Sequence, residues 1–573
     1  MRAQALVPAL ALLAAGCLAP SQAALESSAV PVDLLPALYE DLLFENDVVK
    51  AADGKLLDSW VFLPDAPEGT KFPVVVMASP YWKNLDKLEG PLRKSFFVDY
   101  FGPRGYAIVM HSIRGTGDSE GCFDFGGELE QQDLYDVVEH YGTVEWSNGN
   151  VALFGVSYVG TTPWEAAILR PPHLKTIVPV AGISDMYRYM YFEGTGYSLP
   201  GGAGGGPTFP TYYYPSVDWG VPVFGAGVPV VDELRHMKDS ACQTAVQAIA
   251  KGYQTQVDGA HDAFWDERDY SSQVGEIDIP VFVVHGLQDW NVKPDNFEPM
   301  LTALQQRDVP TKAWLGQWEH NIPARNTFNK DWSRADWNAT LQKWFDRWLY
   351  DVPNGVEADA AVEVQDALGA WRNETAWPPA RAENVRLFPL PSGVLAGSVE
   401  GEGALRFTAM PMTRPVVDEP FPFSGQNLGD RVVFTTDPLA SDLRLAGTPT
   451  VNLTVTRATA GDGHLVVALF DVEDSGTWQE IDRGFLNLRQ WQSRDEAGAP
   501  PVGTPFTVTV RMYPQDLVLE AGHRLSLVVA GEHEEWILPA PTPQTYTLHV
   551  GEGTFLTIPV LPEADGGLAT APD

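Results

Sequence analysis

The chain has 573 residues, which is too long for one ordinary hydrophobic core and predicts two or three domains. Hydrophobic residues make up 45% of the chain and 18 residues are tryptophan, a composition typical of a buried globular protein and not of a disordered one. The formal net charge of −37 leaves no basic surplus to neutralise phosphate, which argues against nucleic acid or an anionic membrane as a partner.

Residues 1–23 are typical of a signal peptide. Arg2 is followed by an apolar run over residues 5–13 and then by the small residues that signal peptidase prefers. The run is too short for a convincing membrane span. A lipid anchor at Cys17 is the alternative, although the residues before it match a lipoprotein site weakly, so simple secretion is favoured. Both interpretations predict export.

Two cysteines, Cys122 and Cys242, would remain in the mature chain. An even pair of cysteines in an exported protein favours a disulfide between them. The alternative is a pair of inert buried thiols.

Residues 35–184 alternate between strand and helix patterns. Apolar residues that alternate on both sides of Asp53 and Gly54 predict a hairpin over residues 47–65. A helix is expected at residues 128–141. Continuous apolar runs predict strands at residues 72–77, 106–110, 151–154 and 175–180. Such runs are typical of a mostly parallel sheet with helices on both faces, that is, of an α/β domain.

A sharp turn follows the predicted strand 151–154. It reads Gly155-Val-Ser157-Tyr-Val-Gly160, and a helix is expected after it. In an α/β-hydrolase such a turn is the nucleophile elbow, which presents the serine oxygen at the C-terminal edge of the sheet. The second glycine usually comes one residue earlier, so an ordinary tight turn is the alternative. Ser157 is the candidate nucleophile.

The alternation breaks over residues 185–273. This segment holds a glycine-rich aromatic stretch at residues 194–215 and helical text at residues 230–253. Insertions on a rigid sheet often carry substrate recognition, and this many aromatic side chains favours burial. A helical cap over the active site is therefore predicted.

The α/β pattern resumes over residues 274–355, where Asp289 follows one predicted strand and His320 follows the next. A serine needs a histidine to take its proton, and the histidine needs a carboxylate to hold its tautomer. In α/β-hydrolases the three occur in the order Ser, Asp, His on loops after strands. Ser157, Asp289 and His320 are therefore predicted to form a triad, with Glu319 as a competitor for Asp289.

An oxyanion also needs hydrogen-bond donors. The N–H of Tyr158 is one, and the second is expected from the loop after the strand that ends at Met77. The histidines lack metal-ligand spacing, and the glycines do not form a dinucleotide or phosphate loop. No metal and no cofactor are therefore expected.

Residues 380–562 change in character. Short alternating segments separated by Gly, Pro and Asp predict a β-sandwich. The expected strands lie at residues 431–435, 450–455, 464–470, 506–510, 524–530 and 545–550. Residues 563–573 are typical of a disordered tail.

Together the motifs resemble the Xaa-Pro dipeptidyl-peptidase and cocaine-esterase-like (CocE/NonD) family of α/β-hydrolases, over nearly all of the mature chain. The matching text, besides the loops of the predicted triad, is Pro80-Tyr81, Arg114-Gly-Thr-Gly117, Ser119-Glu-Gly121, Trp146-Ser-Asn-Gly149, the Gly155 to Gly160 turn and Arg170-Pro-Pro172. The resemblance implies that Ser157 is the nucleophile, Asp289 the orienting acid and His320 the base. It also implies that the Tyr81 hydroxyl and the Tyr158 N–H bind the oxyanion, and that residues 380–562 form a jelly-roll, galactose-binding-like domain.

Members of the family include dipeptidyl-peptidases, α-amino acid ester hydrolases, acylases and esterases. Members that act on a free amino group recognise it with carboxylates. Asp262, Asp266 and Glu267, beside Trp265, are candidates for such an ammonium pocket. A solvated helix face in an acidic protein is an equal alternative.

We therefore expect an exported serine hydrolase that works through an acyl-enzyme on peptides or on small esters or amides. Cleavage of Xaa-Pro peptides is favoured over ester hydrolase or acylase activity. The alternative from another class is a catalytically silent binding protein that uses its β-sandwich. The sequence leaves a homo-oligomer open.

Overall fold

The computed structural model describes residues 34–82, 96–197, 242, 259–320, 323, 334–410, 429–533, 536–537 and 540–562. The expected signal peptide 1–23, Cys17, the tail 563–573 and most of the expected cap lie outside the described residues. Within the described ranges, no helix is long and apolar enough to cross a membrane.

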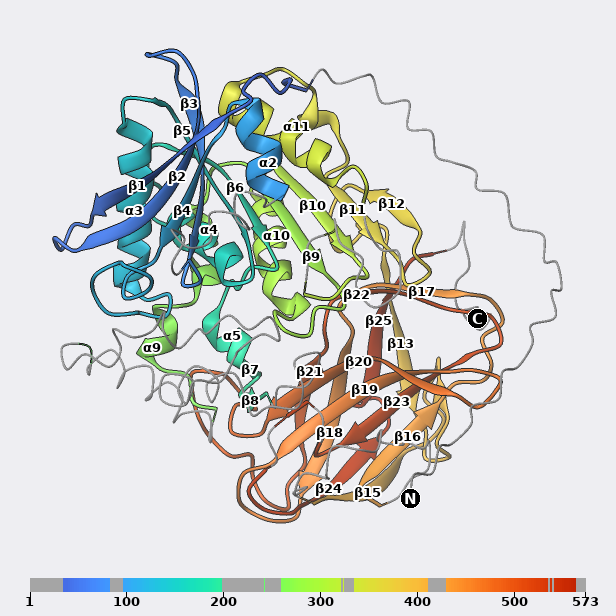
Figure 1. Ribbon diagram of the computed structural model, residues 1–573. Coiled ribbons are helices and arrows are strands. Elements are labelled where there is room, and N and C mark those ends of the chain that lie inside the picture. The colour runs from blue at the N-terminus through green and yellow to red at the C-terminus, as the bar shows by residue number, and fades with distance from the viewer. Residues whose placement is uncertain are drawn as a thin grey trace, which may run out of the picture.

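Ten strands form one sheet in the N-terminal part (Figure 1). Their spatial order is β1 (Leu42–Lys50), β2 (Leu56–Pro64), β4 (Ala107–Ser112), β3 (Phe72–Ser79), β5 (Ser147–Val156), β6 (Leu174–Val180), β9 (Val281–Gly286), β10 (Thr311–Gly316), β11 (Val362–Gln365) and β12 (Trp371–Glu374). The strands from β4 to β11 in this order run parallel, and β1, β2 and β12 are antiparallel to their neighbours. The carboxyl ends of the central strands therefore lie at one edge.

Helices and short turns of 3₁₀-helix connect these strands. Their bounds are α2 (Phe96–Phe101), η2 (Gly102–Arg104), α3 (Glu128–Thr143), α4 (Tyr158–Ala167), α5 (Met186–Met190), α9 (Ala263–Asp266), η6 (Tyr270–Glu276), η7 (Pro294–Asn296), α10 (Phe297–Gln306), α11 (Trp337–Tyr350) and η8 (Val356–Ala358). A two-stranded hairpin follows α5 and consists of β7 (Tyr191–Phe192) and β8 (Thr195–Gly196).

The central strands are apolar throughout because both faces of the sheet are covered. Val74 and Val76 of β3 pack into one core with residues of α3, α4 and α10. Val75 packs into the opposite core with residues of α2 and α11. Successive residues of a strand point to opposite faces, so a continuous apolar run fills both cores. The predicted mostly parallel sheet with helices on both faces is confirmed (Figure 1).

The sheet continues beyond residue 355, where the sequence pattern placed the end of the catalytic segment. β11 pairs in parallel with β10, and β12 closes the edge in antiparallel. Each of these strands has only four residues. Runs this short give a weak periodic signal, and pairing with β10 stabilises them.

The C-terminal part is an antiparallel β-sandwich (Figure 1). The larger sheet contains β13 (Glu383–Pro389), β14 (Leu395–Ala396), β15 (Gly403–Ala409), β17 (Leu443–Gly447), β18 (Thr450–Arg457), β21 (Phe506–Arg511), β22 (Gln515–Leu519), β24 (Gln544–Val550) and β25 (Phe555–Val560). The smaller sheet contains β16 (Arg431–Thr435), β23 (Arg524–Ala530), β19 (His464–Val472) and β20 (Trp478–Asn487). Their inward-facing residues share one apolar core, as the alternating pattern predicts.

A disulfide joins Cys122 and Cys242, whose Cα atoms are 5.3 Å apart. It ties the loop before α3 to a position 120 residues later in the chain. The bond therefore fixes Cys242 next to the loop that precedes α3.

Candidate active site

Ser157 lies in a strained turn at the carboxyl end of β5. Its φ of 65° and ψ of −127° put a residue with a side chain at positive φ, directly before α4. Such strain is held by surrounding structure and is typical of functional sites. The Ser157 N–H donates to Val180 O at 3.0 Å, and Gly160 N donates to Ser157 O at 2.8 Å. Together these bonds hold the turn against the neighbouring strand β6.

The two glycines of the turn are required by close packing. A Cβ on Gly155 would lie 2.3 Å from Val159 Cγ1, and a Cβ on Gly160 would lie 2.4 Å from Val180 O. Val159 lies against Gly155, whereas Gly160 is the residue of α4 that meets β6, so the second glycine falls at position 160. The displaced glycine thus fits an elbow whose first helical turn packs directly on the sheet.

Asp289 and His320 meet on the loops after β9 and β10. His320 Nδ1 donates to Asp289 Oδ2 at 2.8 Å. The other carboxylate oxygen, Oδ1, accepts from the N–H groups of Asn291 and Val292, both at 2.9 Å. Asp289 is fully buried, whereas the His320 side chain is 21% exposed. The carboxylate is therefore oriented by its own loop and presents one oxygen to the imidazole.

Close contact between the two loops depends on Gly286. A Cβ at this position would lie 2.1 Å from Trp318 O and 2.9 Å from Glu319 O. Glu319 itself is exposed, and Asp289 rather than Glu319 binds the imidazole. His285 is buried and donates to Val292 O at 2.8 Å, so it binds the end of the Asp289 loop to β9. Burial lowers the pKa of His285.

Ser157, Asp289 and His320 thus follow three parallel strands at the same edge of the sheet. No hydrogen bond joins Ser157 Oγ to His320 Nε2, two residues that the structure describes. Such bonds are often long before substrate binds.

Tyr81 and Tyr158 occupy different environments. Tyr158 begins α4, and its buried hydroxyl donates to Glu130 Oε1 at 2.8 Å, so its backbone N–H is the group that is left as a candidate oxyanion donor. Tyr81 follows β3 and is half-buried. Burial, and after it the neighbouring Tyr81 and Asp289, raise the pKa of Tyr189. Tyr81 packs against the apolar core that also contains Tyr189.

Tyr189 of α5 was not singled out from the sequence. Its hydroxyl donates to Asn291 Oδ1 at 2.9 Å, two residues after Asp289. Its side chain thus links the expected cap to the Asp289 loop. Nothing in the local pattern distinguishes it from the neighbouring tyrosines, because the contact spans 102 positions of sequence.

The buried carboxyl group of Glu130 binds Tyr158, the residue that follows Ser157. Glu130 of α3 accepts from Gly126 N at 3.0 Å as well as from Tyr158. Burial raises the pKa of Glu130 from 4.5 to about 8. Glu165 lies close by and accepts from Tyr270, and burial also raises its pKa. At neutral pH the folded protein therefore favours a protonated Glu130.

We expect Glu130→Gln to change how stability depends on pH. A raised pKa stabilises the fold fully below pH 4.5, and this contribution is lost as the pH rises through about 8. The difference between these two pKa values corresponds to at most about 5 kcal/mol. The neutral amide does not titrate, so the variant lacks this loss. As the pH rises from 5 to 8.5, the unfolding free energy of the variant should therefore increase relative to that of the wild type. Urea unfolding at both pH values measures this.

Glu128→Gln is the matched control, since Glu128 is an exposed carboxylate on the same helix. Its unfolding free energy should follow the wild type at both pH values. If the Glu130→Gln curve also stayed parallel to the wild type, the buried carboxyl would not be protonated in the folded protein.

The acidic residues expected in the cap are engaged by their own surroundings. Asp262 accepts from Phe264 N at 3.0 Å as the N-cap of α9, and Glu267 lies 2.9 Å from Arg268. Trp265 is buried against tyrosines of α5 and β7. The Asp266 carboxylate is 67% exposed. These contacts fit a capped, solvated helix face.

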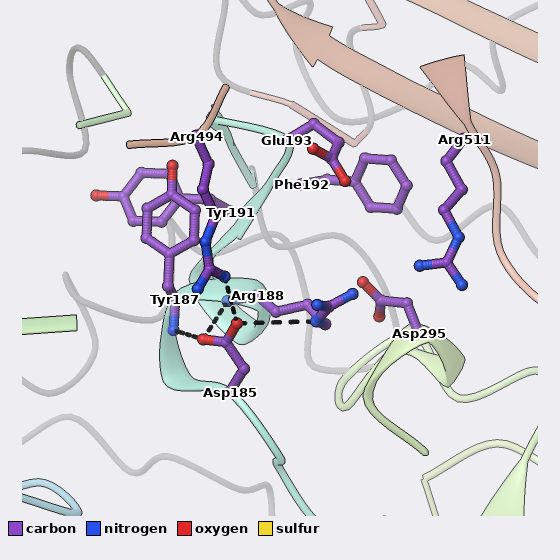
Figure 2. Close-up of a pocket in the computed structure, with 9 residues that line it drawn as sticks. All are labelled: Asp185, Tyr187, Arg188, Tyr191, Phe192, Glu193, Asp295, Arg494 and Arg511. Carbon is purple, nitrogen blue, oxygen red and sulfur yellow. Dashed lines mark hydrogen bonds and ion pairs between the residues drawn. The ribbon is translucent and has the colours of Figure 1, made fainter. Parts of the chain in front are cut away.

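A cavity of about 50 Å³ lies between α5 and the β-sandwich (Figure 2). It is lined by Asp185, Tyr187, Arg188, Tyr191, Phe192, Glu193, Asp295, Arg494 and Arg511. Arg494 binds Asp185 at 3.0 Å, and burial raises the pKa of Asp295 to about 7. Three guanidinium groups thus face three carboxyl groups, one of them partly neutral, which leaves the lining without a surplus of negative charge. None of the four residues predicted for the ammonium pocket lines this cavity.

Two family profiles match the chain. The profile for X-Pro dipeptidyl-peptidase (S15 family) matches residues 53–321, which include Tyr81, Ser157, Asp289 and His320. The profile for the X-Pro dipeptidyl-peptidase C-terminal non-catalytic domain matches residues 354–558.

The chain belongs to the X-Pro dipeptidyl-peptidase (S15) family. The resemblance drawn from the sequence motifs is thereby confirmed. This S15 family member is an Xaa-Pro dipeptidyl-peptidase-like serine hydrolase.

Relatives match this S15 chain over most of its length. A protein of Bacillus anthracis, provisionally named Xaa-Pro dipeptidyl-peptidase, is 29% identical over 562 residues, which cover 91% of this chain and 86% of the relative. One from Streptomyces avermitilis with the same provisional name is 28% identical and covers 87% and 79%.

Solved structures share the fold. An α-amino acid ester hydrolase superposes with a TM-score of 0.73 at 20% identity, over 94% of this chain and all of the other. A CocE/NonD family hydrolase of Staphylococcus aureus superposes with a TM-score of 0.69 at 18% identity, over 91% and 94%. The α/β-hydrolase fold with an antiparallel C-terminal domain is therefore confirmed.

Proposed function

We propose that this chain is an exported serine peptidase that removes Xaa-Pro dipeptides from the amino terminus of peptides through an acyl-enzyme on Ser157. The observation that carries the proposal is the 2.8 Å contact between His320 Nδ1 and Asp289 Oδ2, at the sheet edge where the strained Ser157 turn also lies. The membership of the S15 family supports the substrate class.

The first half of the reaction forms the acyl-enzyme. Ser157 Oγ attacks the carbonyl carbon after proline while its proton passes to His320 Nε2. Asp289 stabilises the imidazolium because its Oδ2 atom already accepts a hydrogen bond from Nδ1 of His320. The Tyr158 N–H and the Tyr81 hydroxyl donate to the oxyanion. The C–N bond then breaks, and the leaving amine takes the proton from Nε2.

The second half releases the dipeptide. His320, neutral again, removes a proton from water as the water oxygen attacks the acyl carbon. The bond between the acyl carbon and Ser157 Oγ then breaks, and Oγ regains the proton from Nε2. The dipeptide leaves, and its new carboxyl group releases its proton to solvent. The same two donors stabilise both oxyanions.

Export is part of the proposal. The disulfide between Cys122 and Cys242 supports it, because such bonds persist in oxidising compartments and are rare in the cytosol.

The proposed function predicts a preference for peptides with a free amino terminus. Alanyl-prolyl p-nitroanilide should be hydrolysed with a kcat/KM at least about tenfold higher than that of its N-acetyl form. A site that releases dipeptides has no room for a group attached to the amino terminus of the substrate. The measurement is initial rates for both anilides, with p-nitrophenyl esters of acetate and of an amino acid alongside.

The same panel distinguishes the alternatives. Hydrolysis of the aminoacyl ester without hydrolysis of either anilide would overturn the peptidase proposal in favour of an α-amino acid ester hydrolase. Equal rates for the two anilides would show that the amino terminus is not recognised. A protein that neither turns over any substrate nor reacts with a fluorophosphonate would be a binding protein.

A further inference from the structure

A strand of the C-terminal sandwich contacts the loop that carries Asp289. β22 lies beside the ends of β9 and β10 (Figure 1), and its first residue, Gln515, is fully buried. Gln515 Nε2 donates to Leu287 O at 3.1 Å, and Gln515 Oε1 accepts from Gln288 Nε2 at 3.1 Å. One side chain of the sandwich therefore holds the two residues that directly precede Asp289.

The same strand also holds the loop that carries His320. Gln288 Nε2 donates to Gln317 Oε1 at 3.0 Å, and Gln317 lies three residues before His320. Gln317 Nε2 in turn donates to Asp516 O at 2.9 Å. The side-chain amides of Gln515, Gln288 and Gln317 thus form a chain that begins and ends on β22. The Asp289 loop and the His320 loop are thus both hydrogen-bonded, directly or through one another, to β22.

This strand is itself firmly anchored. Both terminal nitrogens of the Arg372 guanidinium, on β12, bind the buried carboxylate of Asp516, one of them at 2.8 Å. Five residues of β22 also pair with β17. A bidentate pair of this kind restricts orientation as well as distance. β22 is therefore fixed relative to the edge of the ten-stranded sheet.

The other flank of Asp289 also contacts the sandwich. The ring of Trp290 lies 5.8 Å from that of Tyr513 and 5.2 Å from that of Trp536. The Arg483 guanidinium lies 4.5 Å from the same Trp290 ring. The residues on both sides of Asp289 are thus held by the C-terminal domain.

We propose that Gln515 is a positioning residue, through which the C-terminal sandwich keeps the Asp289 and His320 loops in register with each other. The inference rests on the proposed triad. Asp289 and His320 are on separate loops, so their 2.8 Å hydrogen bond persists only while both loops keep their relative position. An error of about 1 Å in such a geometry can reduce turnover about 100-fold. The chain of side-chain amides directly restrains the position of the Asp289 loop relative to the His320 loop.

The test compares two buried glutamines of the same sandwich. Gln515→Met keeps the length and volume of the side chain and removes both of its hydrogen bonds. Gln544→Met is the matched control, because Gln544 is also buried at the start of a strand. Its amide accepts from Thr459 Oγ1 at 3.0 Å and donates to Thr542 Oγ1 at 3.1 Å, both within the sandwich. Full-length variants are compared in kcat, KM, thermal midpoint and rate of fluorophosphonate labelling.

We expect Gln515→Met to lower kcat and the labelling rate by at least about tenfold, with KM changed less than about twofold. Gln544→Met should lower the thermal midpoint about as much as Gln515→Met does, but it should keep the wild-type kcat. Gln288→Met removes the bond between Gln288 and Gln515 and also the bond to Gln317, so it should reproduce the kcat loss even if Gln515→Met fails to fold.

Folded Gln515→Met and Gln288→Met variants with the kcat of Gln544→Met would overturn the positioning role and leave the sandwich as a structural support. Failure of the proposed function gives a different result. In that case the wild type itself would show neither turnover nor labelling.

Discussion

Ser157→Ala is expected to lower kcat by about 10⁵–10⁶-fold without a loss of stability. Without the hydroxyl no acyl-enzyme forms, and the histidine and aspartate have no nucleophile to activate. Alanine keeps a Cβ at the same strained φ of 65°, so the turn and its bonds to β6 are unchanged. Hydrolysis of alanyl-prolyl p-nitroanilide and the thermal midpoint measure the two parts of this expectation.

A fluorophosphonate should label the wild type at Ser157 and leave the alanine variant unlabelled, as peptide mapping would show. Ser147→Ala is the matched control, since Ser147 is a buried serine at the opposite end of β5. It should keep wild-type turnover. Labelling at another residue, or turnover of Ser157→Ala within tenfold of the wild type, would refute the role of Ser157.

Asp289→Asn is expected to lower kcat by about 10⁴-fold with little change in KM. Asp289 Oδ1 accepts from two backbone N–H groups, so asparagine must place its oxygen there and its NH₂ toward His320. The amide then donates to Nδ1 instead of accepting from it. This favours the tautomer that carries its proton on Nε2, which cannot take a proton from Ser157.

The control is Asp308→Asn, which removes the same charge from an exposed residue after α10. Its steady-state parameters should match the wild type. If Asp289→Asn stayed within tenfold of the wild-type kcat, another acid would orient the imidazole. Glu319 would be the next residue to replace, because it precedes His320 on the same loop.

The amino-acid sequence determined the central strands of the sheet and the order of the site residues. Continuous apolar runs such as residues 72–77 are local signals, because each residue of a covered strand is buried on one face or the other. The Gly155 to Gly160 turn and the loops after β9 and β10 follow from where those runs end. Since parallel strands bring their carboxyl ends to one edge, chain order was enough to propose Ser157, Asp289 and His320 together.

Only the tertiary structure decided which carboxylates are already engaged and which loops are held in place. Asp262 caps α9 and Glu267 pairs with Arg268, whereas the sequence left an ammonium pocket and a solvated helix face as equal alternatives for these acidic residues. Gln515 lies 228 positions from the Leu287 carbonyl that it binds. A glutamine at the start of a strand has no local pattern that names its partner, because packing between distant segments determines that contact.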